Sequence, residues 1–544
     1  MRRLTHNGVR WPAAVLTALL LLYGIAWNRP ASGAETISTN GTLIHVDRSD
    51  PESLDPTVGT GTASQEQGLL MFDTLLAKDN QLRLVPLLVT SWRMSTDGKT
   101  YTFALRKDVE FHSGHHMTSA DVKYSLERLK DKQTGSPFSD LLAIVDRVET
   151  PDPATVVVHL TRPDRMFLDV MSNPATSVLN RESVEKAGKE FGRTVVDGTG
   201  PFKLVSHAFN EQIVYERFDK YRWGPAGYQN RGPARIRRLV WRVVPELTTA
   251  ELMLENGEVD LFTHSTDPSL LARAPGLRGR VEVTRRPVTD TRGLILNTAF
   301  PHLKDLAVRQ AIVRTVDRQR IAASILFPTG TPAVDILHPL AEGYWKGIER
   351  VVRAYDPAKA KQLLDAAGWR VNAEGFREKG GLVLKGLKLM GLPRYQDIAV
   401  VIKESLAAIG IGADIQLLER GRLYPLRRAG GVEMEIYNFE GTADEFDQYL
   451  LSTNVPGTNP FGWKDARTDR WIETFHSAPD ERTALDAAAQ LQKMVVADEA
   501  LVAPIYWITE LNLVNSRTLR DFTGAVWLNT ALGKLLDVWS VRTQ

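Results

Sequence analysis

Apolar and polar residues alternate along this chain with two periods, one typical of strands and one typical of amphipathic helices. Residues 101–105 alternate apolar and polar side chains behind the turn Asp97-Gly98, which predicts a half-buried strand. Residues 360–367 carry apolar side chains at helical spacing between Asp356-Pro357 and Gly368. This arrangement predicts a helix with a capping carboxylate at its start and a glycine at its end.

The same two patterns predict alternating strands and helices through most of the chain. Helices are expected at residues 118–129, 398–409 and 484–495. Strands are expected at residues 42–46, 155–158, 239–244, 294–296, 415–417 and 503–507. Such alternation is typical of α/β lobes whose sheets are covered on both faces, so the expected fold class is α/β.

The first 34 residues have the three parts of a secretory signal. Arginines precede an apolar run at residues 11–27, and residues 31–34 (Ala-Ser-Gly-Ala) place small side chains where a signal peptidase cleaves. We expect cleavage after Ala34 and a Gram-negative-like periplasmic location. The alternative is an uncleaved anchor. A lipoprotein is excluded because the chain has no cysteine to carry the lipid.

Composition narrows the classes of function further. The 67 lysines and arginines nearly balance 65 aspartates and glutamates, which gives no field for nucleic acid or an anionic membrane. The lack of cysteine also excludes disulfides, thiol nucleophiles and cysteine-based zinc sites. A chain of 544 residues with 43% hydrophobic content has the core material for several domain-sized units.

Motifs of catalysis are weak in the sequence or missing from it. No Gly-x-Ser-x-Gly elbow marks a serine hydrolase. Gly98-Lys99-Thr100 resembles the end of a phosphate-binding loop, but Arg93 stands where that loop needs its first glycine. His112, His115 and His116 suggest a metal cluster, yet the last two are adjacent and would point apart in an extended chain. We therefore expect no enzyme, cofactor or resident metal, and keep a metal-chelate binder as an alternative.

A dense run of motifs lies between residues 91 and 122. It consists of Ser91-Trp92-Arg93, residues 97–106, Phe111-His112-Ser113-Gly114 and Ser119-Ala120-Asp121-Val122. Further motifs follow at residues 198–202, 256–260, 296–298, 305–312, 355–360 and 363–369. Their order and spacing resemble the extracytoplasmic solute-binding proteins of ABC importers for peptides, opines and nickel, known as solute-binding protein family 5. The resemblance extends from about Gly41 to Trp507.

The resemblance implies a type II periplasmic-binding-protein fold, with two lobes around a cleft and an extra inserted domain. The implied parts are a signal peptide at residues 1–34, a first lobe at 35–60, 195–288 and 512–544, an inserted domain at 61–194, and a second lobe at 289–511. Segments 198–202 and 286–289 are candidates for the hinge, or else ordinary loops. The implied function is capture of a small polar solute for ABC permease subunits driven by a cytoplasmic ATPase. We expect a monomer, and keep a ligand sensor or chaperone on the same fold as an alternative.

One departure from the family pattern concerns the solute. Members that take peptides anchor the peptide ammonium with an aspartate that follows a glycine after an alternating strand. Here Thr442 follows Gly441, Asp444 lies two residues further on, and Arg420 replaces an expected tryptophan. Threonine cannot neutralise an ammonium, so an anionic or zwitterionic solute is favoured, such as a modified peptide, an opine-like conjugate or a sugar acid derivative.

Arginine can bind a carboxylate or phosphate through two parallel hydrogen bonds, which makes Arg420 a candidate ligand. The alternative is that these arginines are solvated or pair with Glu419 and Glu440, and this reading is favoured for Arg422, Arg427 and Arg428. The other candidate solute contacts are the loop residues Gly59, Thr60, Gly61 and Thr62, which alternatively form a plain turn, and Trp463 and Trp507, which alternatively belong to the core.

Overall fold

The computed structural model describes residues 41–60, 62–79, 83–265, 276, 279–326, 329–443, 445–478, 480–520 and 539–540. The expected signal segment therefore lies outside the described residues. Within the described ranges, no helix is long and apolar enough to cross a bilayer.

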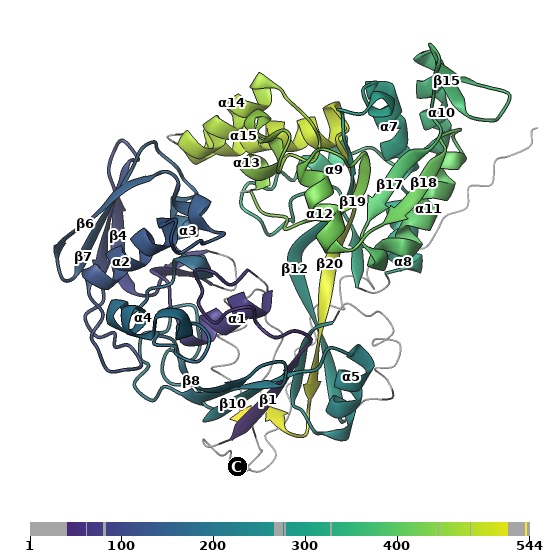
Figure 1. Ribbon diagram of the computed structural model, residues 1–544. Helices are drawn as coiled ribbons and strands as arrows, with labels where there is room; N and C mark the ends of the chain where they lie inside the picture. The colour runs from purple at the N-terminus through teal and green to yellow at the C-terminus, as the bar shows by residue number, and fades with distance from the viewer. Residues whose placement is uncertain are drawn as a thin grey trace, which may run out of the picture. The chain divides into compact units, whose positions relative to one another are not determined.

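One mixed sheet runs through most of the described chain (Figure 1). Its strand order is β18 (Ala413–Leu417), β17 (Leu387–Gly391), β19 (Met434–Phe439), β12 (Val281–Leu296), β20 (Val502–Asn515), β11 (Leu261–Ser265), β1 (Thr42–Asp47), β10 (Arg238–Val243), β9 (Gln212–Arg217) and β8 (Phe202–Ala208). Strand β13 (Gly330–Pro332) pairs with β20 beside this row. β1 is parallel to β10 and β11, and β17 is parallel to β18 and β19. The expected α/β class is confirmed.

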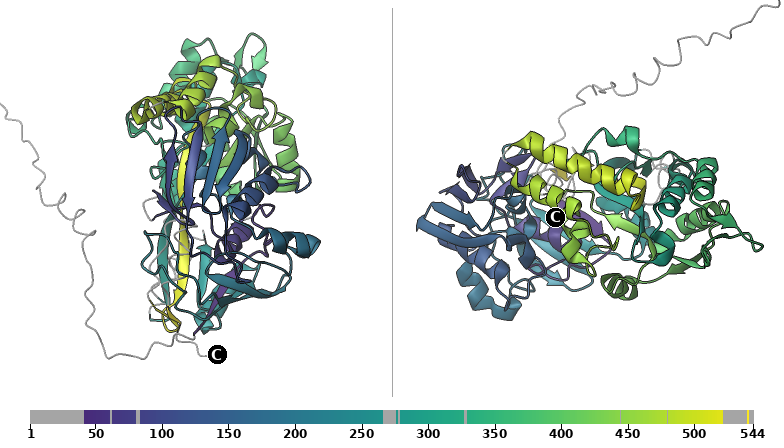
Figure 2. Two further views of the ribbon diagram at one scale, coloured as in Figure 1. Left: turned by 90° about the vertical axis from the view of Figure 1, so that its left-hand side faces the viewer. Right: turned by 90° about the horizontal axis from the view of Figure 1, so that it is seen from above.

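Two long antiparallel strands connect the two ends of this sheet. β12 and β20 pair from Val281 opposite Asn515 to Ile295 opposite Val502. Figure 2 shows β20 in yellow running the length of the sheet from a second direction. The hinge candidate at residues 286–289 lies inside β12, where the pairing changes register between Pro287 and Thr291. Because a register change weakens the ladder locally, this segment stays a hinge prediction.

A second, smaller sheet contains the motif-rich region. Its order is β4 (Val89–Met94), β5 (Thr100–Leu105), β7 (Thr155–Leu160) and β6 (Val145–Asp152), all antiparallel. Helix α2 (Ser119–Lys130) starts as predicted, since the Thr118 amide donates to the Asp121 carboxylate at 2.8 Å. We refer to residues 89–170 as the small-sheet segment.

The helices predicted from punctuation also form. α10 (Pro357–Ala366) starts after Asp356, whose carboxylate accepts from the Lys359 amide at 2.8 Å, and it buries Ala360 and Leu364. α11 (Gln396–Ala407) and α15 (Glu481–Lys493) match the other two apolar stripes. The local patterns were sufficient here because each helix has its own buried apolar face, and α10 and α15 also begin at a capping aspartate.

The remaining helices and strands complete the described part of the chain. The helices are α1 (Thr62–Met71), η1 (Ser139–Leu142), α3 (Phe167–Val170), η2 (Pro174–Thr176), α4 (Arg181–Ala187), η3 (Gly188–Glu190), α5 (Leu247–Asn256), η4 (Pro301–Leu303), α7 (Leu306–Thr315), α8 (Arg318–Ser324), α9 (Ile348–Val351), η5 (Pro393–Tyr395), α12 (Arg420–Arg428), α13 (Glu445–Leu450), η6 (Ser452–Asn454), α14 (Ala466–Ser477) and η7 (Met494–Asp498). The strands are β2 (Leu76–Lys78), β3 (Leu84–Pro86), β14 (Arg370–Val371), β15 (Arg377–Lys379), β16 (Leu382–Val383), β21 (Leu519–Arg520) and β22 (Trp539–Ser540).

The apolar side chains form separate core clusters in the earlier and later parts of the chain. One cluster runs from Leu43 to Leu261, joined by Val514 and Leu519, and includes the small sheet. Two others draw on residues 288–508. We refer to residues 294–505 as the pocket segment.

The glycine-rich stretch at residues 198–202 is a close-packed crossover. A Cβ on Gly198 would lie 2.0 Å from the Met71 carbonyl oxygen, so only glycine fits. The His112 amide donates to the Gly198 carbonyl at 2.8 Å, and His112 Nε2 lies 2.9 Å from the Gly200 carbonyl oxygen. Contacts on both sides oppose a rotation here, so the hinge prediction for this segment is not supported. Burial lowers the pKa of His112 to about 4, which fits a neutral histidine with a structural role.

The close approach at Gly198 predicts the effect of a single methyl group. Gly198→Ala should destabilise the protein by roughly 1–3 kcal/mol or more, because the new Cβ meets backbone atoms that cannot yield. Gly68→Ala is the matched control, since its Cβ meets only Pro56 at an ordinary 3.5 Å. Urea unfolding of both variants would measure the difference, and equal stability of the two would contradict the packing argument.

Candidate functional site

A pocket opens at the carboxyl ends of three parallel strands. β17, β18 and β19 are neighbours with a common direction and end at Gly391, Leu417 and Phe439. In α/β sheets, ligands commonly bind just beyond such strand ends, where successive loops diverge. The lining residues are Leu392, Arg394, Tyr395, Arg420, Tyr424, Arg427, Arg428, Glu435, Ile436, Tyr437, Asn438, Glu440, Gln448, Tyr449, Gly457 and Thr458.

Helix α12 supplies one wall of this pocket. Arg420, Tyr424, Arg427 and Arg428 line it and are spaced by four, seven and eight residues, which places them on one helical face. Arg422 is exposed and does not line the pocket. The helical period therefore places Arg427 and Arg428 at the pocket with Arg420, whereas the sequence analysis had grouped them with Arg422.

Arg427 is neutralised inside this wall. Its Nε donates to Glu435 Oε2 at 2.9 Å and its Nη2 pairs with Glu435 Oε1. The guanidinium carbon lies 4.6 Å from the Tyr424 ring centre and 4.4 Å from that of Tyr437. Burial raises the pKa of Glu435, and Arg427 opposes that rise. The pairing favoured for Arg427 is thus present, with Glu435 in place of Glu419 or Glu440.

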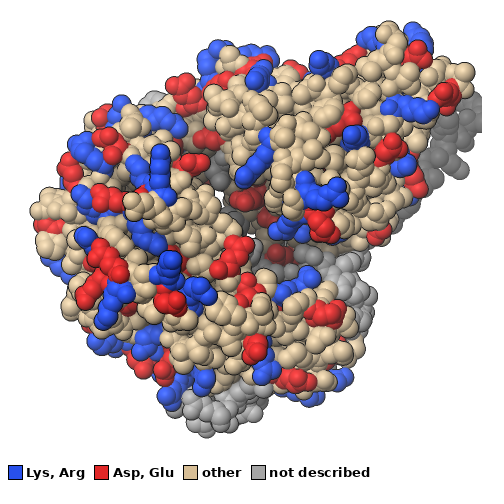
Figure 3. All heavy atoms as spheres, in the orientation of Figure 1, with Lys and Arg blue, Asp and Glu red and all other residues tan. Residues whose placement is uncertain are grey.

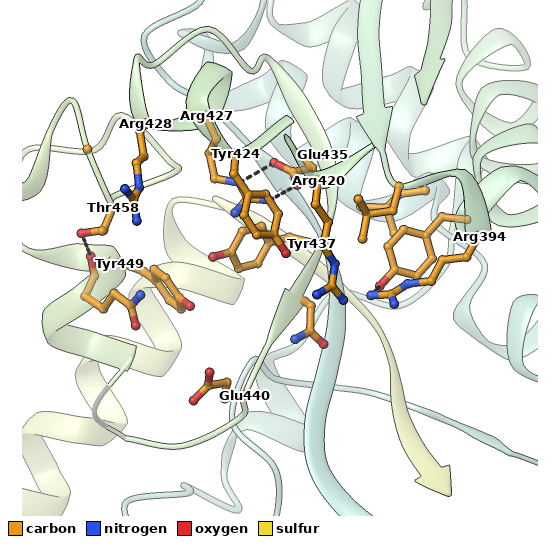
Figure 4. Close-up of a pocket in the computed structure, with 16 residues that line it drawn as sticks. Arg394, Arg420, Tyr424, Arg427, Arg428, Glu435, Tyr437, Glu440, Tyr449 and Thr458 are labelled. Carbon is orange, nitrogen blue, oxygen red and sulfur yellow. Dashed lines mark hydrogen bonds and ion pairs between the residues drawn. The ribbon is translucent and has the colours of Figure 1, made fainter. Parts of the chain in front are cut away.

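Other arginines present their charge to the pocket. Among the residues that the structure describes, neither Arg420 nor Arg428 has a recorded ion pair, and both are exposed. Figure 4 shows Arg420 and Arg394 near one end of the pocket and Arg428 beside Thr458 near the other. The lining holds four arginines against two glutamates, so the pocket carries a positive excess. Elsewhere on this face, basic and acidic side chains are intermingled (Figure 3).

Two buried polar atoms that lack a hydrogen-bond partner in the described part of the chain belong to paired strands, and one of them is in the pocket lining. Asn438 of β19 is paired in register with Arg292 of β12. Asn438 Oδ1 and Arg292 Nε are both buried, and neither has a hydrogen-bond partner among the described residues. Arg292 keeps an ion pair with Asp290 at 3.5 Å. A buried donor or acceptor that has no partner costs free energy unless water or a guest meets it.

The predicted Gly441 has a structural role. Its φ is +72° and a Cβ would lie 1.9 Å from the Thr289 carbonyl oxygen of β12. Glu445, which the sequence analysis did not single out, accepts from the amides of Glu440 and Gly441 at 2.6 and 2.9 Å. The Thr442 carbonyl accepts from the Glu445 amide at 3.3 Å. Asp444 lies outside the described residues.

The other candidate contacts are placed away from the pocket lining. Thr60 Oγ1 donates to Glu52 at 2.7 Å, and the Gly59 carbonyl accepts from Gln65 at 2.7 Å. Thr62 begins α1, and Gly61 lies outside the described residues. Trp463 packs against an apolar cluster and donates to Thr468 at 3.2 Å. These contacts favour the structural alternatives, while a solute contact stays a prediction for the loop.

Several lining residues were missed by the sequence analysis. Arg394 and Tyr395 follow β17, and Gln448 and Tyr449 lie on α13, so chain distance separates them from Arg420. The signal for Tyr424 was present, since helical spacing from Arg420 places it on the same face. The presence of Arg394, Tyr395, Gln448 and Tyr449 in the lining follows only from the order of the strands in the sheet.

The chain matches the family model for bacterial extracellular solute-binding proteins, family 5 Middle, over residues 83–460. The chain belongs to this family. The expected role as the solute-binding component of an ABC importer is thereby confirmed.

Individual relatives agree with this assignment. The glutathione-binding protein GsiB of Salmonella choleraesuis is 27% identical over 461 residues, covering 80% of this chain and 84% of that protein. The ABC transporter substrate-binding protein CtaP of Listeria monocytogenes has a TM-score of 0.79 at 20% identity, covering 92% of this chain and 100% of that one. NikA of Brucella suis, solved with Fe(III)-EDTA, has a TM-score of 0.79 at 24% identity, covering 91% and 99%. At these identities the two structures show the shared fold.

The buried pair in the pocket wall predicts an asymmetric mutational effect. Arg427→Met should destabilise the protein by about 3–5 kcal/mol, because it leaves the Glu435 carboxylate buried without a counter-charge. The double variant Arg427→Met/Glu435→Met should recover most of this loss. Thermal unfolding of the single and double variants would measure both, and an additive further loss in the double variant would contradict the pairing.

Proposed function

We propose that this protein captures a small anionic or zwitterionic peptide-like solute through carboxylate contacts in the arginine-lined pocket. The observation that carries the proposal is the excess of arginine over glutamate in the lining, with Arg420 and Arg428 unpaired among the described residues. The solute would be handed unchanged to ABC permease subunits by a monomeric protein outside the cytoplasmic membrane. The cleavable signal and the lobe boundaries given above belong to the same proposal.

The physical basis is the cost of removing a charged solute from water. A carboxylate enclosed in a pocket loses its hydration, so charged donors must replace the lost water contacts. Guanidinium groups can do so with paired, charge-assisted hydrogen bonds. Arg394 and Arg420 lie together near one end of the pocket in Figure 4, which suits a single planar anionic group.

Glutathione is the first solute to test. The relatives with about a quarter of their residues identical are named for it. Glutathione has two carboxylates and one ammonium. Arginines near both ends of the pocket suit the two carboxylates, and Glu440 in the lining offers a negative charge for the ammonium. A peptide amide N–H of the solute could also donate to Asn438 Oδ1, since Asn438 lines the pocket.

The alternatives are less well supported. A metal chelate held by protein ligands would need clustered donors, and the described residues contain no group of three or more histidines and carboxylates arranged to hold a metal ion. His115 is exposed, and only a 4.0 Å approach links it to Asp121. A sensor on the same fold would use the same pocket. It would bind the same class of solute but act on a partner other than ABC permease subunits.

The decisive experiment is calorimetric titration of glutathione into wild-type protein and two arginine variants. Arg420→Met should weaken binding on the order of tenfold to a hundredfold, because charge-assisted hydrogen bonds contribute about 1.5–3 kcal/mol. Arg422→Met is the matched control, since it lies on the same helix outside the lining and should bind like the wild type.

Ligand variants test the charge requirement separately. Glutathione with both carboxylates amidated should bind much more weakly than the free acid, and the difference should shrink in Arg420→Met. Tight binding of the diamide, or micromolar binding of plain dipeptides of every kind, would overturn the anionic assignment while leaving the family role intact.

A further inference from the structure

A buried histidine joins two parts of the chain that are far apart in sequence. His476, near the end of α14, lies between two carboxylates. Its Nδ1 is 2.8 Å from Asp164 Oδ1 in the small-sheet segment, and its Nε2 is 2.7 Å from Asp447 Oδ1 in the pocket segment. The His476 side chain is 4% exposed and that of Asp164 is 9% exposed. The bridge therefore spans the contact between the two segments.

The geometry fits a positively charged histidine. An ionised carboxylate only accepts hydrogen bonds, so both ring nitrogens must donate. Only the imidazolium form carries a proton on both nitrogens. The bridge then joins one positive charge to two negative ones, with His476 and Asp164 buried and Asp447 34% exposed.

Neighbouring contacts reinforce the same junction. The Arg165 amide donates to the His476 carbonyl at 2.9 Å, and its side chain pairs with Glu342 at 2.6 Å. The Arg165 guanidinium carbon lies 5.3 Å from the Phe475 ring centre. Met166 packs against the apolar cluster of the pocket segment.

The junction is rigidly held on the small-sheet side. The Tyr101 hydroxyl donates to the Asp164 carbonyl at 3.3 Å, and the Met166 amide donates to the Asp164 carboxylate at 2.9 Å. The Tyr101 ring also packs 4.8 Å from the Phe167 ring. Asp164 is therefore presented by a fixed loop that the small sheet supports.

We infer that Asp164, His476 and Asp447, with Arg165 and Glu342, form a latch that holds the small-sheet segment against the pocket segment and so tunes solute affinity from outside the pocket. The latch rests on the two-lobe closure of the proposed function and is independent of the solute's identity. Contacts made only when the segments touch shift the equilibrium toward the closed form. The apparent dissociation constant falls as the closed, binding-competent fraction rises.

The latch also makes closure sensitive to alkaline pH. Burial would lower the pKa of His476, but hydrogen bonds to Asp164 and Asp447 and their charges outweigh burial and raise the pKa to about 9. The stabilisation by a group with a raised pKa is complete below the ordinary value of 6.5 and is lost as pH rises through about 9. Closure should therefore weaken across that window.

Other charged and titratable groups surround this histidine at the junction. On the small-sheet side they are Arg162, 3.8 Å from Asp164, together with Arg165 and Tyr101. Burial and Asp164 raise the pKa of Tyr101 to about 12, beyond the window for His476. On the pocket side they are Asp447 and Glu342, and α15 contributes apolar side chains such as Ala484 and Ala488 to the cluster around Phe475.

Small-angle X-ray scattering without solute tests the latch directly. His476→Gln and Asp164→Asn should each enlarge the radius of gyration at pH 7, because each removes charge from one side of the junction. The wild type should expand as pH rises through about 9, and His476→Gln should lack that step. Affinity for glutathione should fall about fivefold or more in both variants, a typical coupling between distant positions.

His207→Gln is the matched control. His207 is buried and pairs with Asp50 at 3.0 Å, but that pair joins β8 to the loop after β1 and does not cross the junction. This variant should keep the wild-type radius and pH profile. Thermal unfolding identifies any variant that fails to fold. If His476→Gln or Asp164→Asn fails to fold, scattering of the other one and of Arg165→Met tests the latch instead.

The outcomes separate the two proposals. Identical scattering and identical pH profiles for wild type, His476→Gln and Asp164→Asn would overturn the latch whatever the solute. A scattering difference without any glutathione binding would support the latch and reject that solute. A similar expansion in His207→Gln would show a general loss of stability and would also overturn the latch.

Discussion

The antiparallel pairing of β12 with β20 is the constraint on which the other features depend. The 16 residues of β12 and the 14 residues of β20 share one ladder that joins both ends of the large sheet. Backbone hydrogen bonds buried in such a ladder have no replacement if the strands separate. β12 also supplies the carbonyl of Thr289 that requires glycine at position 441, and Arg292, which pairs in register with Asn438 of the pocket lining.

The pocket combines a neutral wall with uncompensated charge, and the two have different physical roles. The pair of Arg427 and Glu435 lies between Tyr424 and Tyr437, where mutual neutralisation allows burial. Arg420 and Arg428 remain exposed, where their charge is hydrated until a guest replaces the water. The Arg427–Glu435 wall is already formed without solute, so few protein groups need to rearrange when a solute binds. This limits the free-energy cost of association.

Much of the architecture was accessible from local patterns. The capping residues Asp356 and Thr118 predicted helix starts that the structure confirms, and period-two alternation predicted β5. Arg420 was identified as a departure from the family pattern and does line the pocket. The loop at residues 59–62 stays a predicted solute contact, although the Thr60 hydroxyl already donates to Glu52 and the Gly59 carbonyl already accepts from Gln65.

The amino-acid sequence by itself determined the family, the fold class, the helix starts and the electrostatic character of α12, because each depends on residues close together in the chain. Only the tertiary structure decided that Arg394 joins Arg420, that Glu435 neutralises Arg427, and that His476 meets Asp164. The first results from the strand order of the large sheet, and the second from the packing of α12 against the next strand, β19. The third joins residues 312 positions apart, and no local period encodes a contact made only when separate segments pack together.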